Sequence, residues 1–468
     1  MSRDPRFDGR FIVAVLTTGI YCRPVCPAKT PASDNVRYFL SAAAAQDAGY
    51  RPCLRCRPET AAPLPEWSIG SRTVIQGLRL IGAGVVDREG AAGLARRLGL
   101  SQRHLNRLFQ RELGATPKSL ALTRRRQLAK RLLDETSLPL AQIALQAGYG
   151  SVRRFNDDLR QVYERSPRQL RGSAPRPSDI ELRLPVRQPY HVDWVFDFLA
   201  RRALSGLEEV QGRCYRRRIR DRAGTLHWVQ VRWDGDALRL QIPRSADVEL
   251  AEVLPRVRRV FDLDADSAVV DAHLAGDPLL GDVLAAGPGL RVPGAWDGFE
   301  TAVRAVLGQQ VSVDRATRLA HLLMQRYGGG LFPEPAALAA ANPAEIGMPG
   351  RRGAAISALA AAVADGDLEL HDGVDAQDLR AALVAVPGIG PWTAGYVSMR
   401  VARDPDAFVD SDWVVLKVLG ATPARARALA EAWRPWRAYA VMYLWRLAGL
   451  RRAETAPAAS LPQSQPEE

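Results

Sequence analysis

Hydrophobic and polar positions follow three different patterns along the chain. Between residues 88 and 170, apolar residues recur at helical spacing, interrupted at Gly and Pro, with no strand-like alternation. Between 180 and 291, short runs alternate between apolar and polar residues, as at 228–233 and 238–242. From 296 to 452, an Ala-rich and Leu-rich helical pattern returns. These patterns predict an all-helical unit, a small α/β unit and a second all-helical unit.

Length and charge narrow the class of protein. The 468 residues exceed what one core usually organises, so several domains are expected. Lys and Arg outnumber Asp and Glu by 64 to 51, which gives a net charge of +13 and favours a polyanionic partner such as nucleic acid. The alternative is the Arg usage of a GC-rich genome, which would raise the Arg count without raising the net charge much. No run of about 18 apolar residues and no signal-peptide pattern occur, so we expect a cytoplasmic protein.

Four of the five cysteines fall in two tight pairs, Cys22 with Cys26 and Cys53 with Cys56. Two pairs of this spacing can close a tetrahedron of thiolates around zinc. Unrelated structural thiols are the alternative. Arginines beside both pairs would favour thiolates and attract phosphate. The fifth cysteine, Cys214, is expected to be a packed thiol.

These pairs lie in segments that resemble a known family. Residues 17–24, 35–36 and 51–56 resemble the metal-binding domain of the Ada DNA-repair and regulatory proteins. The resemblance implies that Cys22 is a zinc ligand and also accepts a methyl group from a methylphosphotriester in the DNA backbone. The transfer would be stoichiometric, and loss of charge from the sulfur would weaken its repulsion with phosphate and favour DNA binding. A purely structural zinc site is the alternative.

Two helix-turn-helix patterns follow. The first combines a helix, a turn at Gly99, the N-cap Ser101 and a second helix over 102–113, and the second pattern covers 141–155. A single pattern of this kind is more often an ordinary solvated helix. Two patterns on one connecting helix resemble the AraC family of DNA-binding domains. The other motifs that match this family lie at 114–117, 147–149 and 166–170. The polar positions that suit a major groove are Arg103, Asn106, Arg107, Arg153 and Arg154.

A Gly-x-Gly hairpin joins two helical patterns at residues 386–394. Gly388 and Gly390 let backbone amides approach a DNA phosphate without reading sequence. Asp412 follows Gly388 by 24 residues. The hairpin and its later Asp resemble the AlkA-type 3-methyladenine glycosylases of the helix-hairpin-helix superfamily. The other matching stretches are 299–312 and 433–437.

The resemblance to the AlkA-type glycosylases implies roles for individual residues. Asp412 would be the carboxylate that stabilises positive charge on the sugar as the bond to the purine breaks. Asp410 would be a local cap. Trp392 stands where relatives that also cut the strand carry Lys, so no strand cleavage is expected. Because no cysteine follows Cys214, we expect neither an iron–sulfur cluster nor an alkylguanine methyltransferase.

Aromatic residues and one glutamine complete the expected site. An alkylated purine is cationic, so electron-rich rings would attract it, although core packing is the alternative for each ring. A flipped base leaves a gap that a wedge fills, and Gln310 stands in the wedge loop 308–311 where some relatives have Leu. The aromatic residues at family pocket positions are Trp392, Tyr396, Trp413, Trp445 and Phe198.

Together these motifs predict a multidomain DNA alkylation-repair protein that also regulates transcription. Its enzymatic reaction would be hydrolysis of the N-glycosidic bond of alkylated purines such as 3-methyladenine. Zinc is the expected cofactor, double-stranded DNA (alkylated and promoter) the expected partner, and an activator would also contact RNA polymerase. The alternatives are an activator whose C-terminal half is a noncatalytic DNA clamp, and an enzyme whose first 170 residues only target it. The expected parts are a small zinc α/β domain (1–62), an all-α double helix-turn-helix domain (75–172), an α+β N-terminal glycosylase domain (180–292), an all-α helix-hairpin-helix glycosylase domain (293–452) and a disordered tail (453–468).

Overall fold

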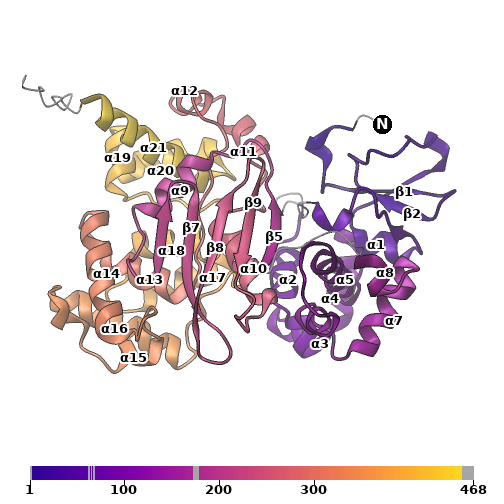
Figure 1. The fold of residues 1–468 in the computed structure, drawn as a ribbon. Helices are drawn as coiled ribbons and strands as arrows, with labels where there is room; N and C mark the ends of the chain where they lie inside the picture. Colours follow the sequence, from indigo (N-terminus) through magenta and orange to yellow (C-terminus); the bar gives the residue numbers. More distant parts are fainter. Residues whose placement is uncertain (1–2, 62–63, 65, 67–68, 172–178, 456–468) are drawn as a thin grey trace, which may run out of the picture.

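The chain folds into several domains, as the sequence predicts (Figure 1). The computed structural model describes residues 3–61, 64, 66, 69–171 and 179–455. The last helix runs to Thr455, and the rest of the predicted tail lies outside the described residues. We call residues 3–61 the N-terminal module, 69–171 the helical module, 179–297 the sheet module and 298–455 the C-terminal module. None of the helices in the described ranges is both long and apolar enough to cross a bilayer.

The N-terminal module is a four-stranded sheet with one helix packed on it. The strands lie in the order β3-β1-β2-β4, with β2 antiparallel to β1 and parallel to β4. Helix α1 is capped by Ser41 and covers one face, where Ile12, Ala14, Tyr21 and Ala45 form a small core. The bounds are η1 (Pro5–Phe7), β1 (Ile12–Val15), β2 (Ile20–Cys22), η2 (Ser33–Asn35), β3 (Val36–Phe39), α1 (Ala42–Asp47), β4 (Arg51–Pro52) and η3 (Pro58–Thr60).

The helical module repeats one helix-turn-helix plan on either side of the long helix α5. Ser101 caps α4 and Ser151 caps α7, each with its side chain accepting a backbone N–H. The two capped helices bury apolar residues at the same spacing, Leu105, Phe109 and Leu113 in α4 and Phe155, Leu159 and Tyr163 in α7. The bounds are α2 (Arg72–Gly82), α3 (Val85–Arg97), α4 (Gln102–Leu113), α5 (Pro117–Glu135), α6 (Leu140–Gln146), α7 (Val152–Tyr163) and α8 (Pro167–Arg171).

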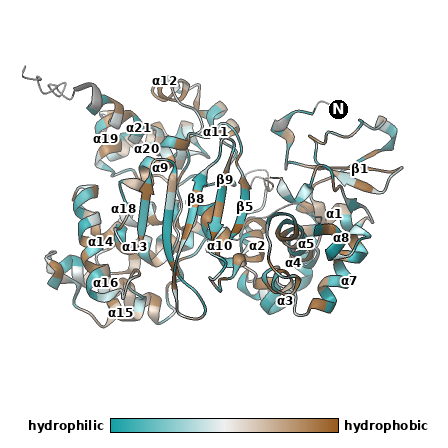
Figure 2. Cartoon of the chain, viewed as in Figure 1, coloured by the Kyte–Doolittle hydropathy of each residue, from teal (hydrophilic) through white to brown (hydrophobic). Residues whose placement is uncertain are grey.

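The sheet module is built on a five-stranded antiparallel sheet in the order β5-β9-β8-β7-β6. Apolar and polar residues alternate along β8 and β9 (Figure 2). One face of each strand is therefore more buried than the other. The strands are β5 (Ile180–Pro185), β6 (Glu208–Gln211), β7 (Cys214–Arg220), β8 (Leu226–Trp233) and β9 (Ala237–Ile242), and the helices are α9 (Val192–Ala200), α10 (Leu250–Val260), α11 (Ser267–Leu274) and α12 (Gly281–Ala285).

The C-terminal module is helical in the part that the structure describes. Two hydrophobic cores hold it together, one around α13 and α16 and one around α21. The bounds are α13 (Gly298–Leu307), α14 (Val313–Tyr327), α15 (Pro335–Ala339), η5 (Pro343–Ile346), α16 (Gly350–Ala364), α17 (Ala376–Ala385), α18 (Pro391–Arg400), α19 (Trp413–Leu419), α20 (Pro423–Ala430), η6 (Glu431–Trp433) and α21 (Arg437–Thr455).

Packing continues from the helical module into the sheet module. Leu132 of α5 and Leu182 of β5 belong to one hydrophobic core. At the same place Arg131 donates to the backbone oxygen of Arg183 (2.8 Å), and the Arg183 backbone N–H donates to Glu135 (3.1 Å). The two modules therefore share a hydrophobic core and are held together by more than the segment that connects them.

A cluster of ion pairs joins the helical module to the C-terminal module. Glu66 pairs with Arg79 of α2 at 2.7 Å and with Arg403 at 3.4 Å. Arg403 also pairs with Asp264 at 3.4 Å. Burial opposes ionisation of Asp264, but Arg258 and Arg403 outweigh that effect and lower the pKa of its carboxyl group. Burial opposes the charged form of Arg403, but the carboxylates around it outweigh that effect and raise the pKa of its guanidinium.

Candidate functional site

Four cysteine thiols converge at one edge of the N-terminal sheet. Cys22 ends β2, and Cys53 directly follows β4, which lies beside β2. Cys26 and Cys56 lie in the turns that follow, and all four sulfur atoms lie within 4.8 Å of one another. Thiolates bound to zinc at about 2.3 Å would stand about 3.8 Å apart in a tetrahedron, which fits this cluster. The quartet is therefore positioned to bind a metal ion.

Arg23 connects the two cysteine pairs. Its backbone N–H donates to Cys56 Sγ at 3.3 Å, and its side chain donates to the backbone oxygen of Cys56 and to Thr60. Its guanidinium also pairs with Asp8. The sequence suggested that arginines beside the cysteines attract phosphate. Arg23 instead forms an ion pair with Asp8, and its hydrogen bonds to Cys56 and Thr60 stabilise the loop of the second cysteine pair.

The polar residues predicted to enter a major groove lie on the outer sides of α4 and α7. Arg103, Arg107, Arg153 and Arg154 are exposed, and Asn106 is half-buried. Arg153 has 92% of its side chain exposed. Both helices lie at the end of the molecule away from α13 and α18 (Figure 1). The structure therefore presents two polar helix faces that are separate from the C-terminal module.

A cleft of about 1710 Å³ lies between the sheet module and the C-terminal module. Helices α9, α13, α14, α18, α19 and α21 contribute to its walls. It brings together residues that are far apart in the sequence. The residues predicted for base binding, catalysis and hairpin contacts that line it are Phe198, Gln310, Gly388, Gly390, Trp392, Tyr396, Asp412, Trp413 and Trp445.

The hairpin between α17 and α18 forms one rim of the cleft. Gly388 has a φ of +85°, and a Cβ atom there would lie 2.6 Å from the methyl group of Ala355. Gly390 is the N-cap of α18, and no side chain caps this end, so first-turn amides can meet an anion. Gln309 donates to Gly388 O (3.1 Å) and to Thr393 Oγ1 (3.0 Å), which ties the neighbouring loop to the hairpin.

Gln310 lies in that neighbouring loop, between α13 and α14. It is exposed and has a φ of 57°, a left-handed conformation that a residue other than Gly rarely adopts. Arg352 donates to the backbone oxygen of Gln309 at 2.6 Å and so supports the loop from the α16 side. The loop is therefore held from two elements next to its tip.

Asp412 lies in the cleft as a buried carboxylate, with 8% of the residue exposed. It is the N-cap of α19, where Oδ1 accepts the Val415 backbone N–H at 3.0 Å. Oδ1 also accepts the indole N–H of Trp445 at 3.2 Å, and Oδ2 accepts the indole N–H of Trp392 at 3.1 Å. Three N–H groups from three helices therefore determine the position of this carboxylate.

Comparison with known proteins gives three matching family models and relatives that span nearly the whole chain. The models are the metal binding domain of Ada over residues 1–59, a helix-turn-helix domain over 94–173 and the AlkA N-terminal domain over 181–297. A Mycobacterium tuberculosis protein described as a probable bifunctional transcriptional activator/DNA repair enzyme AlkA is 42% identical over 472 residues, covering 95% of this chain and 94% of that protein. The chain belongs to the family of this AlkA protein.

Two further relatives each match a part of this AlkA-family chain. The Escherichia coli DNA-3-methyladenine glycosylase 2 is 38% identical over 276 residues, which cover 56% of this chain and 95% of that protein. The Escherichia coli bifunctional transcriptional activator/DNA repair enzyme Ada is 38% identical over 122 residues, covering 25% of this chain and 32% of that protein. The resemblances to Ada and AlkA proteins are thereby confirmed, and the helix-turn-helix model over 94–173 confirms a helix-turn-helix domain. With the Ada metal-binding model over the four cysteines, the predicted zinc-binding domain is confirmed too.

The aromatic residues of the AlkA-family cleft differ in their stacking, exposure and partners. Trp392 and Tyr396 stack with their ring centres 5.5 Å apart and their planes at 15°, and Trp445 lies 6.3 Å from Tyr396. Trp413 is 63% exposed and lies at the rim. Phe198 is buried, and the guanidinium of Arg202 lies 3.7 Å from its ring centre. Its ring is thus already in contact with a cation.

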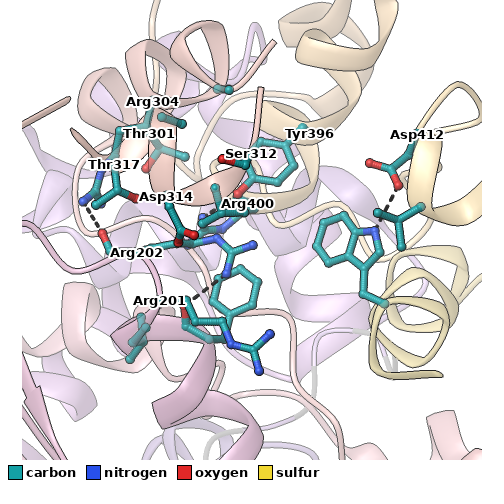
Figure 3. Close-up of a pocket in the computed structure, with 18 of the residues that line it drawn as sticks. Arg201, Arg202, Thr301, Arg304, Ser312, Asp314, Thr317, Tyr396, Arg400 and Asp412 are labelled. Atoms are coloured by element: carbon teal, nitrogen blue, oxygen red, sulfur yellow. Dashed lines mark hydrogen bonds between the residues drawn. The ribbon is translucent and has the colours of Figure 1, made fainter. Parts of the chain in front are cut away.

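Two arginines in the cleft were not predicted from the sequence. Arg202 and Arg400 lie on the same side as Tyr396, away from Asp412 (Figure 3). Arg400 donates to Tyr396 Oη at 2.8 Å. Burial opposes ionisation of Tyr396, but Arg400 and Arg202 outweigh it and lower the pKa of the phenol. Burial also lowers the pKa of Arg202 to about 10. The only sequence signal was spacing, because each arginine follows its aromatic partner by one helical turn.

The prediction that Asp410 is a local cap is wrong. Asp410 forms an ion pair with Arg427 at 2.5 Å, and Arg427 has 59% of its side chain exposed. The cap of α19 is Asp412 itself. The two neighbouring carboxylates therefore lie in different surroundings, one paired near the surface and one bonded to indoles in the cleft.

Proposed function

We propose that the chain is a monofunctional DNA glycosylase that hydrolyses the N-glycosidic bond of alkylated purines such as 3-methyladenine. The observation that carries the proposal is Asp412, a buried carboxylate held by two indoles in an aromatic cleft. The hairpin glycines Gly388 and Gly390 form the rim of the same cleft. The relatives described as AlkA and DNA-3-methyladenine glycosylase 2 support it.

The geometry suggests how binding and chemistry divide between residues. The first-turn amides of α18 bind a phosphate of the damaged strand, and Gln310 occupies the gap that a flipped nucleotide leaves. The ring of Trp392 stacks on the electron-poor base. As the glycosidic bond breaks, positive charge develops on the sugar, and the Asp412 carboxylate stabilises it. Water then adds to the sugar, giving a free base and an abasic site.

The strand itself should remain intact. Strand cleavage by this class of enzyme uses an amine that forms a Schiff base with the sugar. Two residues after Gly390 the side chain is the indole of Trp392, whose N–H already donates to Asp412. An indole cannot replace that amine, so the expected product is an abasic site in a continuous backbone.

The decisive experiment is release of methylated bases from alkylated duplex DNA by the intact chain. Free 3-methyladenine should appear, and the strand should break only after alkali. A chain that binds the duplex tightly and releases no base would instead favour the noncatalytic DNA clamp. Direct strand breaks without alkali would overturn the monofunctional mechanism.

A second proposed activity concerns the cysteine quartet, and the Ada metal-binding model over this module favours it. The Cys22 sulfur attacks the methyl carbon of a methylphosphotriester, a sulfur–carbon bond forms and the carbon–oxygen bond breaks. The electron pair remains on oxygen, so the product is an ordinary phosphodiester and an S-methyl cysteine. Zinc, when bound, keeps the thiols deprotonated. Each chain would accept one methyl group, and peptide mass mapping should find it on Cys22 alone.

Transcription control is the third part of the proposal. The outer sides of α4 and α7 would read promoter DNA, and an activator would also contact RNA polymerase in the cytoplasm. Loss of negative charge at Cys22 would strengthen DNA binding. A gel shift on the candidate promoter should therefore tighten after methylation. Unchanged binding would favour an enzyme whose N-terminal half only targets it to DNA.

A further inference from the structure

An aromatic surface lies on the same face of the N-terminal sheet as Cys22. In the register of β1, Val13 pairs with Cys22 on one side and with Tyr38 on the other. Directly paired residues of antiparallel strands point to the same face, so Tyr38, Val13 and Cys22 form one row across the sheet. Neighbouring strands lie about 4.8 Å apart, which puts the backbones of Tyr38 and Cys22 about 10 Å apart.

This face is unlike the face that α1 covers. Tyr38 is 63% exposed and Phe7 is 40% exposed. Phe11 joins them, with its ring centre 5.6 Å from that of Tyr38 and 5.9 Å from that of Phe7. We call these three residues the aromatic surface. The opposite face buries Tyr21 and its neighbours against α1. Tyr38 and Phe7 remain exposed although Val13 in the same row is buried, so packing within the module leaves these two rings accessible to a partner.

The substrate proposed for Cys22 differs in charge from the DNA around it. A methylphosphotriester is neutral, whereas each neighbouring phosphodiester carries one negative charge. Arginine and lysine therefore attract the neighbouring phosphates more strongly than the triester itself. An aromatic ring packs against a sugar whatever the charge of the adjoining phosphate. The aromatic surface can thus bind the DNA beside the neutral triester, where a cationic side chain would favour the neighbouring phosphodiesters instead.

We propose that Tyr38, supported by Phe11 and Phe7, packs against the deoxyribose of a nucleotide near the methylphosphotriester and aims the methyl carbon at Cys22 Sγ. The proposal rests on the methyl transfer proposed above. Tyr38 is a positioning residue, because it forms no bond with the methyl group. One nucleotide rises about 3.4 Å along a strand, so a separation of about 10 Å reaches nucleotides up to about three steps away.

The test compares methyl transfer rates of full-length, zinc-loaded variants. The substrate is a duplex with one radiolabelled methylphosphotriester. Tyr38→Ala should lower the second-order rate about tenfold or more, because burial of a side chain of this size is worth about one to two orders of magnitude. Tyr38→Phe keeps the ring and should recover the rate. Leu16→Ala removes a 43% exposed apolar residue from the same module and is the matched control. The salt dependence of transfer should be the same in Tyr38→Ala as in the unaltered chain, because no charge is lost.

Methyl iodide, which can alkylate Cys22 without DNA, separates positioning from damage to the metal site. Tyr38→Ala should react with methyl iodide as fast as the unaltered chain. Equal slowing of both reactions would assign the defect to the cysteine quartet and overturn the inference, as would equal transfer from DNA by both chains. If the unaltered chain accepts no methyl group from the duplex, the proposed transfer and this inference both fail. That outcome is distinct from a failure of Tyr38 alone.

Discussion

Replacing Asp412 by Asn should abolish base release while leaving the fold and DNA binding largely intact. Asparagine caps helices about as well as aspartate, so α19 should keep its N-cap bond to Val415. The amide oxygen can accept that N–H and the indole N–H of Trp445. The amide nitrogen then faces the indole N–H of Trp392, which loses its acceptor. Leaving one such donor unpaired costs about 1 to 3 kcal/mol of stability.

The effect on rate should be larger than the effect on stability. The carboxylate acts on charge that exists only in the transition state, so its loss lowers the chemical step and spares ground-state affinity. Loss of comparable electrostatic stabilisation in other enzymes lowers the rate about 10²- to 10³-fold, and we expect at least this for Asp412→Asn. Less reactive neutral lesions should suffer at least as much as cationic ones, because a cationic base departs more readily by itself.

Single-turnover excision of a methylated purine, with a melting curve and a binding isotherm for each variant, checks this prediction. Asp410→Asn is the control, because it removes only the ion pair to the exposed Arg427. It should retain most activity. If Asp410→Asn is inactive and Asp412→Asn works, the catalytic assignment is wrong. A parallel loss of binding and excision in Asp412→Asn would show that the carboxylate supports the fold of the cleft and not the chemistry.

Three further predictions concern other parts of the chain. Cys53→Ala should lose its metal, because three thiolates remain, so elemental analysis should fall from one zinc per chain to none; full retention would contradict a four-sulfur site. Gly388→Ala should lower the melting temperature and weaken DNA binding, because its φ is +85° and a methyl group lies 2.6 Å from the new Cβ. Gly390→Ala meets open space, and an equal loss in both variants would refute that reasoning. Arg403→Met should cost about 1.5 to 3 kcal/mol at neutral pH, because it removes the cation that Glu66 and Asp264 share, while Arg79 and Arg258 remain as their partners. The folded-state pKa of Asp264 is lowered, so its contribution to stability is present above its unfolded pKa of about 3.9 and is lost as the pH falls further. The urea concentration at the unfolding midpoint of the unaltered chain should therefore decrease as the pH falls below about 4. A decrease of the same size in Arg403→Met would contradict the role of the pair between Arg403 and Asp264.

The parts of the site that the sequence predicted are those encoded by local spacing. Two cysteine pairs and a Gly-x-Gly hairpin are short patterns whose chemistry needs the residues close together in the chain. The partners of Asp412 were beyond such patterns. Trp392 and Trp445 lie 20 and 33 residues away, and the direction of an indole N–H depends on how three helices pack. Their expected role as stacking rings gave no hint of these hydrogen bonds.

Long-range contacts escaped prediction for the same physical reason. Glu66 lies 337 residues before Arg403, and nothing in either local segment indicates the other. Arg202 reaches the cleft from the sheet module, although the excess of Lys and Arg in the sequence was attributed to a polyanionic partner such as nucleic acid. Asp410 and Asp412 also differ only in tertiary surroundings, so local reasoning gave Asp410 the cap that Asp412 provides.

The core shared by α5 and β5 means that the covalent chain is not the sole link between regulator and enzyme. A cut between α8 and β5 would leave each fragment with an apolar face shaped to the other, with Leu132 on one side and Leu182 on the other. The two pieces would then behave as an obligate heterodimer, each insoluble or unstable without its partner. Separating the two activities into independent proteins would therefore require new polar surfaces on both halves. The two halves are therefore joined by a shared hydrophobic core as well as by the polypeptide chain.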